Sequence, residues 1–149
     1  MTLEELFLKS STEIENMKQR MSSLMAEEGL PYGNRTHTYN SRLAQELTKY
    51  AESFEEGEVL NRKLFEAYFV EGLNLADPEV LLELAEFSGL PREETEEVIS
   101  KRLLRNEVDA DWKRSRELGV RGVPTFFYGN RSLVGAQPYE TMRQLVQIK

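Results

Sequence analysis

The chain has 149 residues, a formal net charge of −7 and no cysteine. This length suffices for one domain with a substantial core, and a content of 40% hydrophobic and 30% charged residues is typical of ordinary soluble proteins. Because the balance is acidic and the basic residues are scattered, we expect no nucleic-acid partner. We also expect no membrane association, since no apolar run approaches the roughly 18 residues of a membrane span. The acidic N-terminus does not resemble a secretion signal, which favours a cytoplasmic location.

Helices are predicted for almost all of the first 118 residues. Two capping-box patterns, Thr2 with Glu5 and Thr12 with Glu15, predict one short helix and a second one that ends before Gly29. The second helix carries an apolar stripe with a period of 3.6 residues: Ile14, Met17, Met21, Leu24 and Met25.

The middle of the chain predicts four further helical stretches. The first covers about residues 40–54, and the next runs from after Gly57 to near Gly72. Asp77-Pro78 is an N-cap followed by proline at the first helical position, which opens a helix ending near 89. From Pro91 the pattern continues as helix to Leu118.

The pattern changes at Gly119. Residues Val123 to Tyr128 are β-branched and aromatic, Gly129-Asn130 is a two-residue turn signal, and 131–134 is a second short strand. A final helix opens at Pro138. The predicted fold is therefore mostly α with a small β-hairpin, divided into a helical domain (1–118) and a β-β-α unit packed on it (119–149).

An apolar strand without a partner poses a physical problem. A two-stranded hairpin alone is marginal in water, and its outer edges expose unpaired backbone groups. The strand Val123 to Tyr128 looks like an interior strand, yet nothing else in the sequence reads as a strand to pair with it. We therefore expect it to pair with the same strand of a second chain across a two-fold axis, which makes a homodimer.

Catalytic, metal-binding and cofactor-binding residues are not predicted. His37 is the single histidine, so a transition-metal site lacks ligands, and Ser41 has no histidine placed predictably near it. The glycines form no phosphate-binding pattern. The acidic cluster is interpreted as a solvated helix face: Glu93, Glu94, Glu96 and Glu97. Three aromatic residues are interpreted as core packing: Tyr68, Phe69 and Trp112.

Three stretches in the same order resemble DsbA-like, FrnE-type oxidoreductases of the thioredoxin fold. These are Arg35 to Leu47, Leu64 to Leu75 with the following Asp-Pro, and Gly119 to Phe127 with a later Val-Gly-Ala-Gln-Pro at 134–138. The family inserts a helical domain into a thioredoxin fold. The resemblance implies that this chain begins too late to contain the β-α-β segment with the Cys-x-x-Cys pair, whose first strand would lie beside 123–128.

The resemblance also supplies the predicted binding residues. Val123 and Pro124 match the family's cis-proline dipeptide, whose backbone pairs with an extended substrate segment. Sequence alone would favour a trans bond there, and the resemblance favours cis. The alternative is that the dipeptide only shapes the entry to the strand.

Three functions remain open at this stage. The first is a non-catalytic, self-associating or binding module, because thiol–disulfide exchange needs a thiolate. The second is part of a thiol–disulfide oxidoreductase whose β-α-β segment comes from elsewhere, so that the partners would be an extended peptide or a complementary chain. The third is kinship with glutathione-dependent 2-hydroxychromene-2-carboxylate isomerases.

Overall fold

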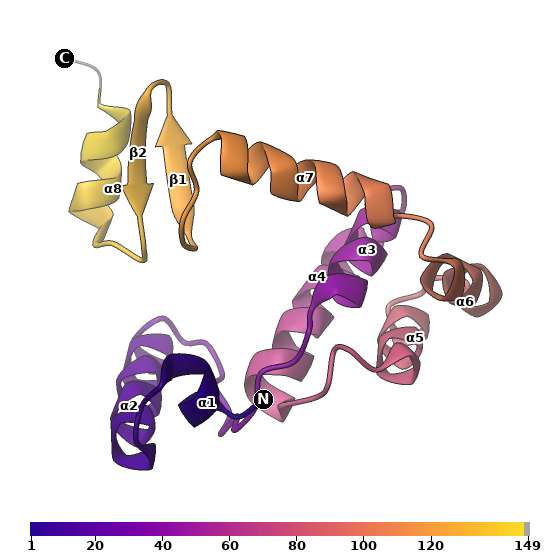
Figure 1. The fold of residues 1–149 in the computed structure, drawn as a ribbon, viewed down its shortest axis with the longest axis horizontal. Coiled ribbons are helices and arrows are strands. Elements are labelled where there is room, and N and C mark those ends of the chain that lie inside the picture. Colours follow the sequence, from indigo (N-terminus) through magenta and orange to yellow (C-terminus); the bar gives the residue numbers. More distant parts are fainter. Residues whose placement is uncertain (148–149) are drawn as a thin grey trace. The chain divides into compact units, whose positions relative to one another are not determined.

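A computed structural model describes residues 1–147 and gives a largely helical protein with one β-hairpin (Figure 1). The elements in chain order are α1 (Leu3–Phe7), α2 (Ser11–Glu27), α3 (Arg42–Ala51), α4 (Gly57–Glu66), the π-helix η1 (Ala67–Glu71), α5 (Pro78–Phe87), α6 (Arg92–Lys101), α7 (Arg105–Glu117), β1 (Thr125–Tyr128), β2 (Arg131–Val134) and α8 (Tyr139–Val146). The predicted fold class is confirmed. None of the described helices is both long and apolar enough to cross a membrane.

The starts of the first two helices differ in how well the sequence predicted them. Thr2 and Glu5 form the expected capping box of α1. The cap of α2 is Ser10, which forms a capping box with Glu13, so the prediction of Thr12 was wrong by two residues. Both capping patterns are present in the sequence. A helix capped by Ser10 is two residues longer than one capped by Thr12, and each added residue contributes one backbone hydrogen bond.

The core of the N-terminal part lies among α3, α4, α5 and α6. Helix α3 contacts each of the other three, and α5 packs against α6. The fully buried side chains Leu47, Leu60 and Leu81 come from three different helices of this group. Around them the core continues with Ala44, Ala51, Leu64, Ala67, Leu75, Leu82, Ala85, Leu90 and Ile99.

The helix predicted to run from Pro91 to Leu118 is interrupted. Helix α6 ends at Lys101, Arg102 adopts the left-handed conformation with φ of 53°, and α7 begins at Arg105. The left-handed residue ends the helix because its N–H turns back to the carbonyl of Ile99. Trp112 in α7 was expected in the core and is instead 49% exposed.

The C-terminal residues form a β-β-α arrangement. Strands β1 and β2 are antiparallel in the register Thr125↔Val134 to Tyr128↔Arg131, which leaves Gly129 and Asn130 as the two-residue turn. Gly129 has φ of 61°, the conformation that such turns require. Helix α8 begins after Pro138, as predicted, and contacts β2.

The chain divides into two compact units, Met1–Val108 and Asp109–Lys149. The division falls inside α7, whereas the sequence predicted domains of 1–118 and 119–149. That domain assignment stays a prediction.

Candidate functional site

The loop before β1 carries the predicted binding residues. The Val123–Pro124 peptide bond is cis, as the resemblance led us to expect. The Thr125 hydroxyl donates to the Gly122 carbonyl at 2.6 Å, and the Gly135 N–H donates to the Pro124 carbonyl at 2.7 Å. These two hydrogen bonds anchor the loop on both sides of Pro124, while the side chain of Val123 is 89% exposed.

The register of the hairpin determines which backbone groups of β1 face outward. Pro124 and Gly135 are a hydrogen-bonded pair, and such pairs alternate with non-hydrogen-bonded ones along an antiparallel ladder. The backbone groups of Phe126 and Tyr128 therefore point toward β2, and those of Thr125 and Phe127 point away from it. Within residues 1–147 the sheet has two strands, so this outer edge of β1 has no strand partner.

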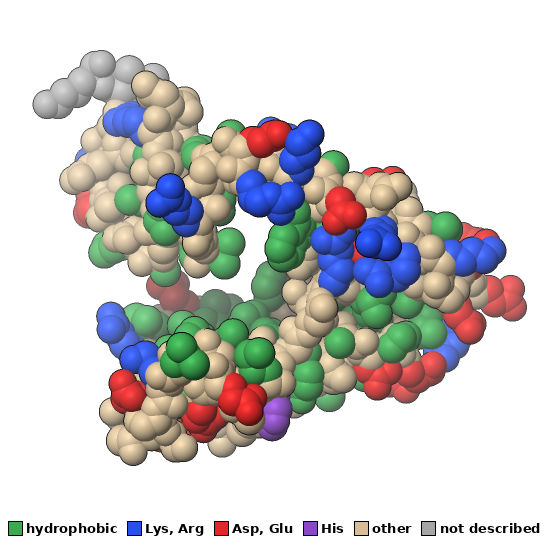
Figure 2. Space-filling view, viewed as in Figure 1, with side chains coloured by type: hydrophobic (Ala, Val, Ile, Leu, Met, Phe, Trp, Pro, Cys, Tyr) green, Lys and Arg blue, Asp and Glu red, His purple; other side chains and the backbone are tan. Residues whose placement is uncertain are grey.

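The unit that carries this edge has no enclosed core of its own. No residue between 109 and 147 is buried. The aromatic side chains of β1, Phe126, Phe127 and Tyr128, are 38%, 45% and 39% exposed, and Figure 2 shows hydrophobic side chains at the surface of this unit. Because side chains alternate along a strand, Phe126 and Tyr128 lie on one face of the hairpin and Phe127 on the other, so each face exposes aromatic surface. Exposed apolar surface of this kind favours an interaction site.

His37, weighed as a metal ligand, and Ser41, weighed as a nucleophile, both have local structural partners. The Nδ1 atom of His37 lies 2.9 Å from the hydroxyl of Thr36. The hydroxyl of Ser41 accepts a hydrogen bond from Gln45 at 3.0 Å, one helical turn ahead. The Thr36–His37 contact joins two adjacent, exposed residues, and the partner of Ser41 is an amide and not a base.

The acidic cluster of α6 lies on the outside of the helix. Its four glutamates are exposed, while Thr95, Val98 and Ile99 face inward. Glu97 pairs with Lys101 at 2.6 Å, and Glu94 accepts from the hydroxyl of Tyr50 at 3.3 Å. These contacts agree with the interpretation as a solvated helix face.

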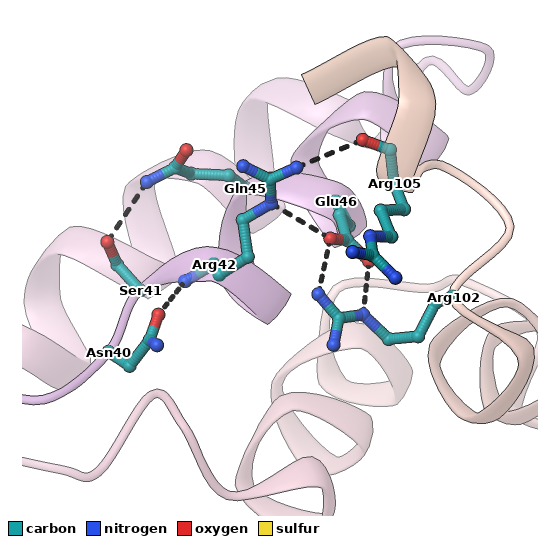
Figure 3. A network of polar contacts seen from close by, with 7 residues as sticks. All are labelled: Asn40, Ser41, Arg42, Gln45, Glu46, Arg102 and Arg105. Atoms are coloured by element: carbon teal, nitrogen blue, oxygen red, sulfur yellow. Dashed lines mark hydrogen bonds and ion pairs between the residues drawn. The ribbon is translucent and has the colours of Figure 1, made fainter. Parts of the chain in front are cut away.

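A buried ionic cluster centred on Glu46 was missed by the sequence analysis (Figure 3). The carboxylate accepts from Nε and Nη2 of Arg102, both at 2.7 Å, and from Nε of Arg42 at 3.0 Å. Arg42 also donates to the carbonyl of Arg105 at 3.0 Å. The Arg102 guanidinium, aided by that of Arg42, holds the pKa of Glu46 below its ordinary value although burial raises it. The only sequence signal was a glutamate next to the apolar positions of α3, which is too common to be diagnostic.

Comparison with known proteins agrees with this architecture. A family model described as a DSBA-like thioredoxin domain matches residues 1–147. A probable DsbA oxidoreductase from Streptomyces coelicolor superposes with a TM-score of 0.84 at 28% identity, over 95% of this chain and 62% of that one. A 2-hydroxychromene-2-carboxylate isomerase superposes with a TM-score of 0.72 at 22% identity, over 83% of this chain and 61% of the isomerase.

The similarity extends to the curated protein YwbO of Bacillus subtilis, which is 30% identical over 101 residues. That match covers 67% of this chain and 50% of YwbO, so the chain spans about half the length of this relative. The family resemblance read from three sequence motifs is therefore confirmed at the level of the DsbA-like domain. The cis-proline loop, the β-β-α unit and the helical part together belong to one family, and the chain is a member of the DsbA-like thioredoxin domain family.

Proposed function

We propose that this chain is a cysteine-free DsbA-like binding module that pairs through the outer edge of β1, in the first place with a second copy of itself. The observation that carries the proposal is the set of outward backbone groups at Thr125 and Phe127, in a unit that buries no residue between 109 and 147. An exposed strand edge presents unpaired backbone donors and acceptors to any chain that can add a strand, and such a strand pairs them while covering part of the exposed aromatic surface.

A two-fold axis at Thr125 would satisfy the edge completely. Thr125 would then pair with its own counterpart, and Val123 of each chain would lie opposite Phe127 of the other. The result is a four-stranded antiparallel sheet made from two hairpins, with the same contact on both sides. A cytoplasmic location stays part of this proposal, and fractionation of cells that express the tagged chain tests it.

Sedimentation equilibrium over a wide concentration range tests the dimer. Phe127→Pro removes an outward N–H without removing a hydrogen bond to β2, so it is expected to shift the protein to monomer while the helical circular dichroism persists. Tyr139→Ala is the matched control, because it removes an exposed aromatic side chain that lies off the edge. A wild-type protein that sediments as a monomer at every concentration contradicts the self-association.

The absence of cysteine permits a second, geometric test. Thr125→Cys would introduce the single thiol of the chain. Facing residues of a hydrogen-bonded antiparallel pair have Cα atoms about 5.5 Å apart, which is within the range of a disulfide. Mild oxidation should cross-link Thr125→Cys into a dimer, whereas Ser132→Cys, an exposed position on β2, should remain largely uncross-linked.

The alternative is that a separate β-α-β chain or a further segment covers the same edge. This reading is supported by the coverage of 62% and 50% of the longer relatives. The assembled protein would then be a thiol–disulfide oxidoreductase of the FrnE type, truncated here, and Val123 and Pro124 would shape its groove for an extended peptide. A monomer that acquires insulin-reducing activity when mixed with a cysteine-bearing β-α-β partner would favour it.

A relationship in function to the isomerase is the weakest of the three candidates. The structural similarity to it, at 22% identity, concerns the fold. A rise in melting temperature with glutathione would support this candidate, and an unchanged melting temperature would speak against it.

A further inference from the structure

A second feature lies in the other unit, where the loop at residues 32–38 is docked on the π-helix η1. The Gly33 N–H donates to the Phe69 carbonyl at 3.0 Å. A Cβ atom at Gly33 would lie 1.8 Å from the carbonyl oxygen of Val70, so the close approach requires glycine. Single-turn π-helices are frequent at functional sites. Here η1 presents two aromatic side chains, Tyr68 and Phe69, to the loop.

Arg35 is held on this aromatic surface. Its Cζ atom lies 4.3 Å from the ring centroid of Tyr68 and 5.4 Å from that of Phe69. Its Nη1 atom donates to the His37 carbonyl at 3.1 Å and to the Tyr68 hydroxyl, which also contacts Thr38 Oγ1 at 2.9 Å. Two ring faces and two acceptors thus hold the guanidinium in place.

The opposite edge of the same guanidinium has no acceptor among residues 1–147. There Nε is buried and makes no hydrogen bond. Nη2 also has no partner within residues 1–147. Unlike Nε, it is accessible to solvent. No carboxylate of this part of the chain forms an ion pair with Arg35. A half-buried cation with an unpaired donor is costly, and the π faces offset only part of the cost.

Nε and Nη2 form the fork with which arginine binds a carboxylate through two parallel hydrogen bonds. The chain itself shows this mode, because Arg102 binds Glu46 through the same two atoms. We propose that Arg35 is a binding residue for the carboxylate of a small-molecule ligand, which would accept from Nη2 and, after a small shift of the atoms that cover it, from Nε. Tyr68 acts as a positioning residue through Nη1, and Thr38 acts through the hydroxyl of Tyr68.

Acetate is the probe, because it carries the carboxylate and little else. In ¹⁵N-labelled full-length protein at constant ionic strength, the Arg35 Nε–H resonance should shift saturably with acetate and only weakly and linearly with chloride. Arg35→Lys identifies the resonance by its loss and keeps the positive charge without the fork. Acetate binding to Arg35→Lys and Arg35→Gln, followed on the backbone amides of residues 33–38, should be at least about tenfold weaker. Arg62→Gln, which removes an exposed arginine of α4, should bind like wild type.

Three results would overturn the proposal. The first is an Arg35 resonance that responds to acetate no differently from chloride. The second is sulfate binding as strong as acetate binding, which would indicate a general anion site. The third is unchanged acetate binding in Arg35→Lys, and the amide spectrum of that variant shows whether it is folded. None of these results depends on the β1 edge, so failure here and failure of the proposed dimer are separable.

Discussion

At the scale of single residues, two arginines use the same edge of the guanidinium group differently. The Nε–Nη2 edge of Arg102 is saturated by the buried carboxylate of Glu46, whereas the same edge of Arg35 has no partner in the described part of the chain. Glu46 is 2% exposed, so its charge is stable there only because the arginines surround it. The Glu46 cluster is therefore structural, joining α3 to the residues between α6 and α7.

Replacing Glu46 with glutamine should lower the free energy of unfolding by about 3 kcal/mol, because it leaves Arg102 and Arg42 without their anion. This is the low end of the range for a buried pair, since both arginines are partly exposed. The pKa of Glu46 is lowered in the folded protein, so its stabilising contribution is present above the unfolded value of about 4.3 and is lost as the pH falls through the folded value. Urea unfolding between pH 7 and pH 3 measures both effects, and the acid loss of stability should be smaller in Glu46→Gln.

The matched control is Glu97→Gln, which breaks an ion pair between exposed side chains on α6. Its effect should be much smaller, since exposed pairs contribute little. Equal losses in the two variants would contradict a special role for the buried carboxylate.

At the scale of secondary-structure elements, the start of α2 depends on one capping interaction. The backbone N–H of Ser10 donates to Glu13 at 3.0 Å, and its hydroxyl donates to the same carboxylate at 2.9 Å. These bonds, with Lys9 nearby at 3.2 Å, lower the pKa of Glu13 to about 2. Thr12, the cap that the sequence suggested, is already inside the helix.

Ser10→Ala should therefore raise the pKa of Glu13 part of the way toward its ordinary value, because it removes the hydroxyl donor and keeps the backbone N–H. Thr12→Ala should leave this pKa near 2. NMR titration of the side-chain carboxyl groups measures this pKa in each variant. The same result in both variants would show that Ser10 is not the cap.

At the scale of the whole molecule, the two units differ in how they are stabilised. The unit of residues 1–108 has a core drawn from four helices, whereas the unit from Asp109 onward buries no residue up to Gln147. Regions with few buried contacts open readily, so the second unit should exchange its amide protons faster than the first.

Hydrogen exchange can show whether the β1 edge is covered in solution. In a monomer, the amides of Phe126 and Tyr128 should be more protected than those of Thr125 and Phe127, because only the former face β2. At concentrations at which a dimer forms, the outward amides of Thr125 and Phe127 should become protected as well. If the amides of Thr125 and Phe127 exchange as fast in the dimer as in the monomer, the dimer contact lies outside the β1 edge.

Local signals explain which predictions succeeded. The capping box at Thr2, the Asp77-Pro78 start and the Gly129-Asn130 turn each depend on a few neighbouring residues. The cis bond at Val123-Pro124 was expected only from the family resemblance, because the local sequence favours trans. The break at Arg102 was not predictable from neighbouring residues. A non-glycine residue adopts the left-handed conformation at a cost, and the partner that holds Arg102 there, Glu46, is 56 positions away.

The sequence by itself determined the fold class, the family and the absence of a thiol, because hydrophobic period, turn residues and motif order are properties of the chain. Tertiary structure alone decided which arginine is paired, which carboxylate is buried, and which backbone groups of β1 face outward. Those outcomes depend on contacts between distant residues and on the register of a hairpin, where a shift of one residue exchanges the two edges. The partner of β1 is likewise not determined by the sequence alone, because it depends on which strand pairs with the outward edge.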